Sequence, residues 1–159
     1  MHIDEFKSML EFFPADTSDF TIEKAIDFFQ DIPEEEWCVG YLNHDDAEYG
    51  PQHCAIGQVF AKLSKTPEAA YSGVGDPYSG AIAMKISSWL SPLYGCDYDN
   101  NTWPSTLALV NNGECFESWK FGTTPKARVV NALMSARNRI IEDKQRRKRE
   151  PVLPELPNL

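Results

Sequence analysis

The sequence predicts a mainly α-helical fold: a compact domain of about five to six helices. Apolar residues recur at the three- and four-residue spacing of a helix in several separate segments. Prolines and glycines close most of these segments. The 159 residues are 42% hydrophobic and include 9 Phe, 6 Tyr and 4 Trp, which is enough for one domain with a sizeable core.

The first two helices are predicted on either side of a turn. The first carries apolar residues at helical spacing over 3–13 and stops at Pro14. Thr21 can cap the second, whose predicted buried face is Ile22, Ala25, Ile26 and Phe29. Pro33 ends this helix, and the acidic residues 34–36 are expected to open a short new turn.

The segment 37–42 is short and apolar, so its periodicity fits both a strand and an extended buried segment. The fold class therefore leaves room for a short strand pair. We expect a polar loop over 43–50. A helix should then begin near Gln52 and run to about Leu63, with Cys54 in its first turn.

Glycines and prolines make 64–80 rich in loops, and a helix is predicted from about Ser79 to Leu90, ended by Pro92. Residues 96–104 are polar and typical of turns. The segment 105–110 fits either a short helix or a strand, closed by the Asn111-Asn112-Gly113 turn.

Thr124 is a typical N-cap residue and Pro125 a typical first residue of a helix, so together they predict the start of the last helix. Its apolar stripe is lost past Lys144, and prolines spaced through 151–159 exclude a helix there. We therefore predict one helical domain over 1–143, followed by a basic helix end and a flexible tail over 144–159.

The charge distribution is uneven. The chain carries a net charge of −9, with 16 acidic and 4 basic residues in 1–80 but 8 acidic and 11 basic in 81–159. An acidic body repels nucleic acid, so we expect no such contact except through Arg146, Arg147, Lys148 and Arg149. The alternative for these four residues is a solvated helix end whose bases suit the helix dipole.

No stretch is long and apolar enough to span a membrane, and the N-terminus does not resemble a signal peptide. The sequence therefore predicts a cytoplasmic protein without a membrane partner. In that setting the four cysteines are expected to be free thiols. Without a C-x-x-C spacing or a nucleotide-binding motif, no metal and no cofactor are predicted.

Cys54 is the residue that suggests an enzyme. A thiol in the first turn of a helix has a lowered pKa and needs a nearby base, for which His44 and His53 are the candidates. His53 is adjacent in sequence and would point away, and no histidine follows Cys54 to give the papain order. The alternative is a small buried core residue beside Ala55 and Ile56.

A binding surface is the other hypothesis, because exposed aromatic side chains suit recognition. The candidate residues are Trp37, Tyr41, Trp103, Trp119, Asn111 and Asn112. The alternative for the aromatic residues is that they cap a small core.

Four short motifs occur in a characteristic order. They are Trp37-Cys38-Val39-Gly40, His53-Cys54-Ala55-Ile56-Gly57, Leu109-Val110-Asn111-Asn112-Gly113, and the helix from Ala127 to Ala136. This order resembles a family of small uncharacterised proteins from bacteria and their phages, with Asn112 where that pattern has Asp. The resemblance covers about residues 22–136. It implies a compact helical domain of phage or mobile-element origin and transfers no catalytic residue.

Together these observations favour a non-enzymatic protein-binding accessory of phage or mobile-element type that antagonises a host or defence protein. Two alternatives stay open: a cysteine-dependent enzyme using Cys54, and a small-ligand-binding domain with a pocket near Cys54, Trp37 and the 111–113 turn. The oligomeric state is left open.

Overall fold

The computed structural model describes residues 16–72, 75–94, 105–114 and 117–150, and it confirms the mainly α-helical fold. The helices in these residues are α2 (Ile22–Gln30), α3 (Ala55–Leu63), α4 (Pro67–Ser72), α5 (Pro77–Tyr94), α6 (Ser105–Asn112) and α7 (Pro125–Arg149). Two 3-10 turns, η1 (Glu34–Glu36) and η2 (Ser118–Phe121), and two strands, β1 (Asn43–Asp46) and β2 (Gly50–His53), complete the fold. The predicted helix over 3–13, Trp103 and the tail 151–159 lie outside the described residues.

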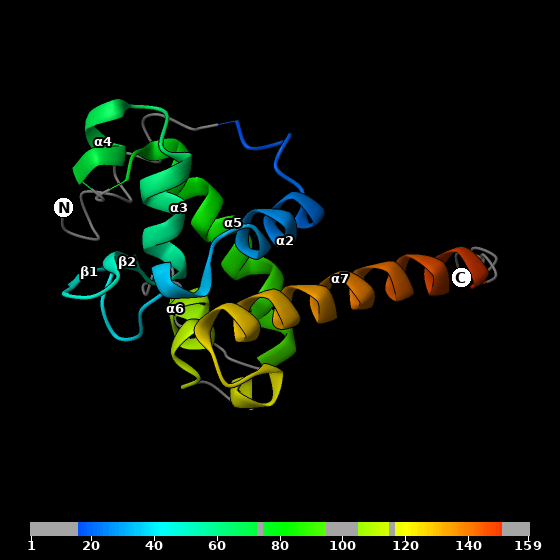
Figure 1. Cartoon of the computed structure of the whole chain (residues 1–159). Coiled ribbons are helices and arrows are strands. Elements are labelled where there is room, and N and C mark those ends of the chain that lie inside the picture. Colours follow the sequence, from blue (N-terminus) through cyan, green and yellow to red (C-terminus); the bar gives the residue numbers. More distant parts are fainter. Residues whose placement is uncertain (1–15, 73–74, 95–104, 115–116, 151–159) are drawn as a thin grey trace.

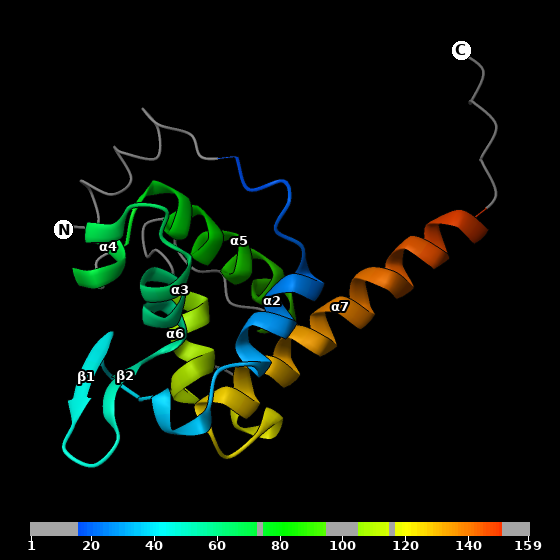
Figure 2. The same ribbon diagram turned by 45° about the horizontal axis from the view of Figure 1, so that its top comes forward.

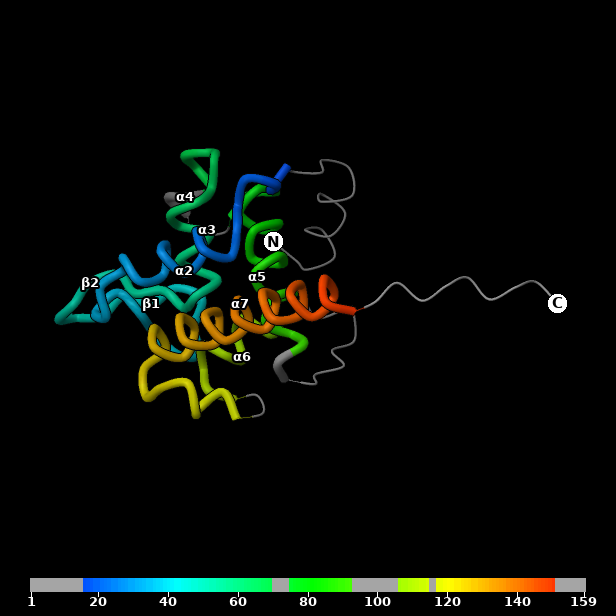
Figure 3. The backbone as a smooth tube through the Cα atoms, turned by 90° about the vertical axis from the view of Figure 1, so that its right-hand side faces the viewer, coloured from blue at the N-terminus to red at the C-terminus, as the bar shows by residue number. Residues whose placement is uncertain are grey.

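The long helix α7 organises the packing. It contacts α2, α5 and α6, while α3 packs against α5 and α6 on the other side of the core (Figure 1). Figure 3 shows α7 running across the molecule in front of α5 and α6. The β1–β2 hairpin lies at the end of the molecule opposite the C-terminal end of α7 (Figure 2). Among the described residues, no helix is both long and apolar enough to span a bilayer.

The helix caps read from the sequence are present. The Thr21 hydroxyl accepts a hydrogen bond from Lys24 N at 3.3 Å, and the Thr124 hydroxyl accepts one from Ala127 N at 3.1 Å. Each satisfies a backbone donor that the first turn of a helix would otherwise leave free. The predicted apolar face of α2 is buried, and it packs against α7.

The prediction of a polar loop over 43–50 is wrong, because these residues form most of an antiparallel hairpin. Asn43 pairs with His53 and Asp46 with Gly50. At the turn, the Asp46 carboxylate accepts hydrogen bonds from Glu48 N and Tyr49 N at 2.8 and 2.9 Å, and Gly50 takes a positive φ of 77°. These strands carry no apolar alternation, so periodicity did not reveal them.

The helix expected from Gln52 begins at Ala55 instead, and Cys54 is its N-cap residue. His53 pairs with Asn43 on one side and forms an isolated parallel bridge with Trp37 on the other, which holds the chain extended up to Cys54. Neither alternative for 37–42 holds over the whole segment: Trp37 forms the isolated bridge and is buried with Cys38, whereas residues 39–42 form a bent, exposed loop.

The segment 64–80, predicted to be rich in loops, contains the helix α4. The next helix, α5, begins at Pro77 rather than at Ser79. The start of α5 is fixed by a reciprocal pair of hydrogen bonds: Asp76 N donates to the Ser79 hydroxyl at 2.9 Å, and Ser79 N donates to the Asp76 carboxylate at 2.8 Å. Pro92 does not end α5, which continues to Tyr94.

The segment 105–112 is a helix, so of the two alternatives the strand is excluded. Gly113 follows it with a positive φ of 71°. Gly113 N donates to Val110 O at 3.2 Å and Glu114 N donates to Leu109 O at 3.0 Å, which is the Schellman pattern of a helix C-terminus. The Asn-Asn-Gly sequence is thus a helix end, and it brings both asparagines to the junction with α3.

Candidate functional site

The side chain of Asn111 connects three separate segments of the chain. It is fully buried, and its Oδ1 accepts a hydrogen bond from Ala55 N at 3.0 Å, at the start of α3. Its Nδ2 donates to Cys38 O and to Asn112 Oδ1, both at 3.0 Å. The amide is therefore satisfied within the chain, and its visible role is to fix α6 against α3 and the segment that follows η1.

Arg128 of α7 completes this junction through the backbone of Asn111. Its Nε and Nη2 donate to the carbonyl oxygen of Asn111 at 3.1 and 2.7 Å, although the side chain is almost fully buried. Burial lowers the pKa of the Arg128 guanidinium. The cation faces the C-terminal carbonyl end of α6, where positive charge is favoured. Reasoning from the sequence missed Arg128, since nothing in its helical position distinguishes it from a surface arginine.

Asn112 and Cys54 hold the loop 38–42 in place. The Asn112 side-chain oxygen accepts a hydrogen bond from Gly40 N at 3.1 Å, where Gly40 takes a positive φ of 85°. Cys54 N donates to Leu42 O at 3.3 Å. The loop is thus fastened at its middle and at its end by residues of α6 and the start of α3, which positions its side chains.

Gly57 permits the close approach of this loop to α3. A Cβ at position 57 would overlap the carbonyl oxygen of Leu42 and lie 3.0 Å from His53 Cβ. The segment that approaches α3 here contributes the Leu42 carbonyl oxygen and the Asn43 side-chain oxygen, the latter 3.2 Å from the same Cβ position.

A small pocket opens between the loop and the helix ends. Its volume is about 170 Å³. It is lined by Gly40, Tyr41, Leu42, Cys54, Ile56, Ala108 and Asn112. Pockets that enclose small ligands have volumes of roughly 300–1,000 Å³. The pocket is therefore small for a metabolite but large enough to receive one protruding side chain.

The two thiols near this pocket are protonated at neutral pH. Burial raises the pKa of Cys54, although the backbone N–H groups of Gly57 and Ile56 favour the thiolate. Burial and the neighbouring Cys54 raise the pKa of Cys38 to about 11, and the Cys38 thiol donates to Tyr41 O at 3.2 Å. The lowered pKa expected for Cys54 from the helix dipole is not found, because desolvation outweighs it.

Neither candidate histidine is placed to activate Cys54. His53 Nδ1 lies 2.6 Å from Asn43 Oδ1, which occupies this ring nitrogen. Burial, followed by the nearby Lys62, lowers the pKa of His53. His44 stacks on Tyr41 with ring centroids 5.7 Å apart. No hydrogen bond joins Cys54 to either imidazole in the described part of the chain.

The predicted aromatic surface divides into exposed and buried members. Trp37 is buried, with its indole N–H 3.5 Å from Ile32 O, whereas Tyr41 is 64% exposed and Trp119 is 63% exposed. Tyr41 does not stand alone in its loop, because Val39 and Leu42 are also exposed. We call Val39, Tyr41 and Leu42 the apolar loop surface. Trp119 lies apart from it on η2.

Acidic residues lie on both sides of the apolar loop surface along the chain. Asp45 and Asp46 belong to β1, Glu48 lies in the hairpin turn, and η1, which consists of three glutamates, contacts β2. Hydrogen bonds from Tyr49 N and Glu48 N lower the pKa of Asp46, which keeps it charged. Within the described ranges, no group of three or more His, Cys, Asp or Glu side chains is arranged to hold a metal ion.

The chain matches no protein-family model, no curated protein and no solved structure. The resemblance to a bacterial and phage family therefore stays a prediction.

Proposed function

We propose that the protein is a non-catalytic protein-binding module that uses the apolar loop surface to hold a partner protein. The observation that carries this proposal is the exposure of Val39, Tyr41 and Leu42 on a loop that Asn112 and Cys54 fasten to the helical core. Exposed apolar side chains on a preorganised segment are typical anchors of protein interfaces, because little conformational entropy is lost on binding.

The partner should be a protein with an apolar centre and a basic rim. Tyr41 and Leu42 also line the small pocket, which offers a place for one side chain of that partner. The acids of β1 and the hairpin turn would face the basic rim and increase the rate of association. An enzyme using Cys54 is disfavoured, because burial raises the pKa of the thiol and, in the described part of the chain, neither the His44 nor the His53 imidazole is hydrogen-bonded to it.

Antagonism of a host or defence protein is the biological role that we propose for this binding. It rests on the resemblance to bacterial and phage proteins, and on the small, acidic character of the chain. Once a partner is identified, its activity should fall when the intact protein is added, and should not fall with a variant that has lost the apolar loop surface.

The test is site-specific photo-cross-linking in an extract of the source cell. A photoreactive amino acid at position 41 should capture one discrete protein, and the same group at position 119 should not, although both positions are similarly exposed. The captured protein should then bind the double variant Tyr41→Ala/Leu42→Ser at least tenfold more weakly than the intact chain.

The matched control is Met84→Ala/Trp119→Ala, which also removes two exposed apolar side chains but from α5 and η2. It should bind like the intact chain. Equal capture from positions 41 and 119, or equal loss of binding in both double variants, would contradict the proposal.

A further inference from the structure

The C-terminal end of α7 extends away from the helices that form the core (Figures 1 and 2). Five of its six residues from 144 to 149 are basic, and all five basic side chains are exposed. They are Lys144, Arg146, Arg147, Lys148 and Arg149. We call these residues the basic helix end. In contrast, α7 packs its residues from Arg128 to Ala136 into the core.

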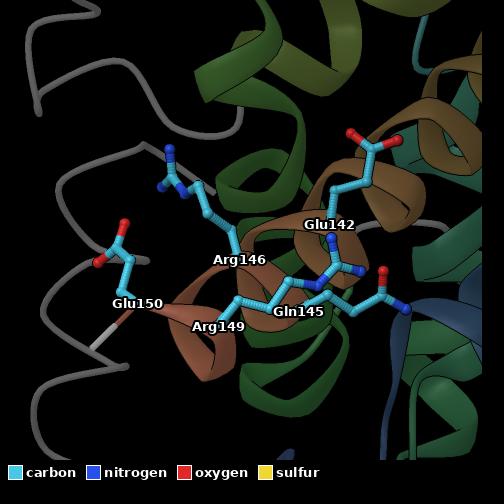
Figure 4. Close-up of a pocket in the computed structure, with 5 residues that line it drawn as sticks. All are labelled: Glu142, Gln145, Arg146, Arg149 and Glu150. Carbon is cyan, nitrogen blue, oxygen red and sulfur yellow. The ribbon is translucent and has the colours of Figure 1, made fainter. Parts of the chain in front are cut away.

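The bases are distributed around the whole helix rather than on one face. A helix advances about 100° per residue. Relative to Lys144, the side chains therefore leave the axis at about 200° for Arg146, 300° for Arg147, 40° for Lys148 and 140° for Arg149. Figure 4 shows Arg146 and Arg149 leaving α7 in different directions. A helix that lies on a flat acidic surface needs bases on one face, whereas one enclosed by negative charge needs them all round.

In the part of the chain that the structure describes, most acidic residues lie on elements other than the C-terminal half of α7. Glu142 and Asp143 precede the basic helix end, Glu150 follows it, and Asp143 approaches Arg146 at 3.6 Å. The acids of the hairpin lie at the opposite end of the molecule (Figure 2). The net charge of −9 therefore does not describe the local field at the basic helix end, which is positive.

One side of the segment also has polar groups suited to reading base edges. Gln145, Arg146 and Arg149 line a surface hollow of about 320 Å³ together with Glu142 and Glu150 (Figure 4). Arginine and glutamine are the side chains that pair with the major-groove edges of guanine and adenine.

We propose that the basic helix end enters the major groove of double-stranded DNA. The groove is about 12 Å wide and a helix with its side chains is about 10–12 Å across, so phosphates lie on both sides of an inserted helix. That arrangement matches bases placed around the whole circumference. The deep, narrow major groove of A-form RNA does not admit a helix in this way.

This inference goes beyond protein binding by the apolar loop surface. The β1–β2 hairpin, which directly follows the loop 38–42, and the C-terminal end of α7 lie at opposite ends of the molecule (Figure 2), so one chain can contact DNA and a protein partner at the same time. Each is testable without the other, because no residue is shared between them.

The test is fluorescence anisotropy of the full chain with a labelled 20-base-pair duplex, titrated from 50 to 200 mM salt. Each basic side chain on a phosphate contributes about 0.9 to the slope of log affinity against log salt concentration, so five contacts give at most about 4.5. Arg147→Gln/Lys148→Gln should lower the slope by about 1.8. Glutamine keeps helix propensity nearly unchanged.

The control Lys24→Gln/Lys120→Gln removes the same charge from exposed positions on α2 and η2, and it should keep the slope of the intact chain. The intact chain should also prefer the DNA duplex to single-stranded DNA, to an RNA duplex and to polyglutamate. Absence of duplex binding at 50 mM salt, equal effects of both double variants, or equal binding to these other polyanions would overturn the proposal.

Discussion

Asn111 at the end of α6 accepts a hydrogen bond from the backbone N–H of Ala55, the first residue of α3, at 3.0 Å through its side-chain oxygen. The two residues are 56 positions apart in the sequence. This bond supplies from another helix the cap that the Cys54 side chain does not provide. It also fixes the position of the α3 N-terminus, to which the loop 38–42 is fastened.

Replacing Asn111 by Ala should lower the free energy of unfolding by about 2–4 kcal/mol, because the buried Ala55 N–H and Cys38 carbonyl lose their partner. Urea unfolding followed by circular dichroism measures the change. The control Asn138→Ala, at an exposed position of α7, should change stability by less than about 0.5 kcal/mol. Similar losses in both variants would show that Asn111 does not organise the junction.

Gly57→Ala should destabilise the fold, although glycine to alanine inside a helix ordinarily stabilises by about 1 kcal/mol. The added methyl group would overlap the carbonyl oxygen of Leu42, so the loop must shift at a cost of about 1–3 kcal/mol. Thermal unfolding of the variant and of the intact chain shows whether Gly57→Ala lowers or raises the melting temperature. A higher melting temperature for the variant would contradict the close packing of the loop on α3.

Asp76 should make stability depend on pH in the acidic range. Burial raises the pKa of Asp76, but hydrogen bonds from Ser79, Thr66 and Lys65 outweigh burial and bring the pKa below its ordinary value of 3.8. Because the folded pKa is depressed, this stabilisation is present above about pH 4 and is lost as the pH falls through the folded pKa.

The measurement is the free energy of unfolding of the intact chain and of Asp76→Asn from pH 7 to pH 2.5. The difference between them should be largest near neutral pH and should shrink below pH 4. Asp19→Asn, at an exposed position, serves as the control and should stay parallel to the intact chain. A constant difference between the intact chain and Asp76→Asn at all pH values would refute the role of the charged carboxylate.

Cys38 should be alkylated slowly in the folded chain. Its pKa is raised to about 11 from an ordinary value of 9.0, which lowers the thiolate fraction at pH 8 by about 100-fold even before burial limits access. Mass spectrometry of peptides after timed alkylation, with and without urea, reports Cys38 and Cys54 separately. Fast native alkylation of Cys54 at pH 7 would restore the cysteine-enzyme hypothesis.

The sequence by itself determined the mainly helical fold class, the caps at Thr21 and Thr124, the buried face of α2 and the helical breaks at Pro33 and Gly113. These features depend on interactions within a few residues, such as a hydroxyl and the N–H three positions on, so local spacing is enough to predict them. Tyr41 and Trp119 are exposed, as a binding surface requires, whereas Trp37 is buried. Residue type alone does not distinguish a buried tryptophan from an exposed one.

Tertiary structure alone decided the hairpin, the start of α3, the pKa values of the thiols and the convergence of loop 38–42 with Asn111, Asn112 and Arg128. Each depends on contacts between segments distant in the sequence: His53 with Asn43 and Trp37, and Asn111 with Cys38 and Ala55. The N-terminus of a helix lowers the pKa of a cysteine thiol, and so makes it reactive, when the thiol is exposed to solvent. Here other segments bury Cys54, and desolvation reverses the direction of its pKa shift.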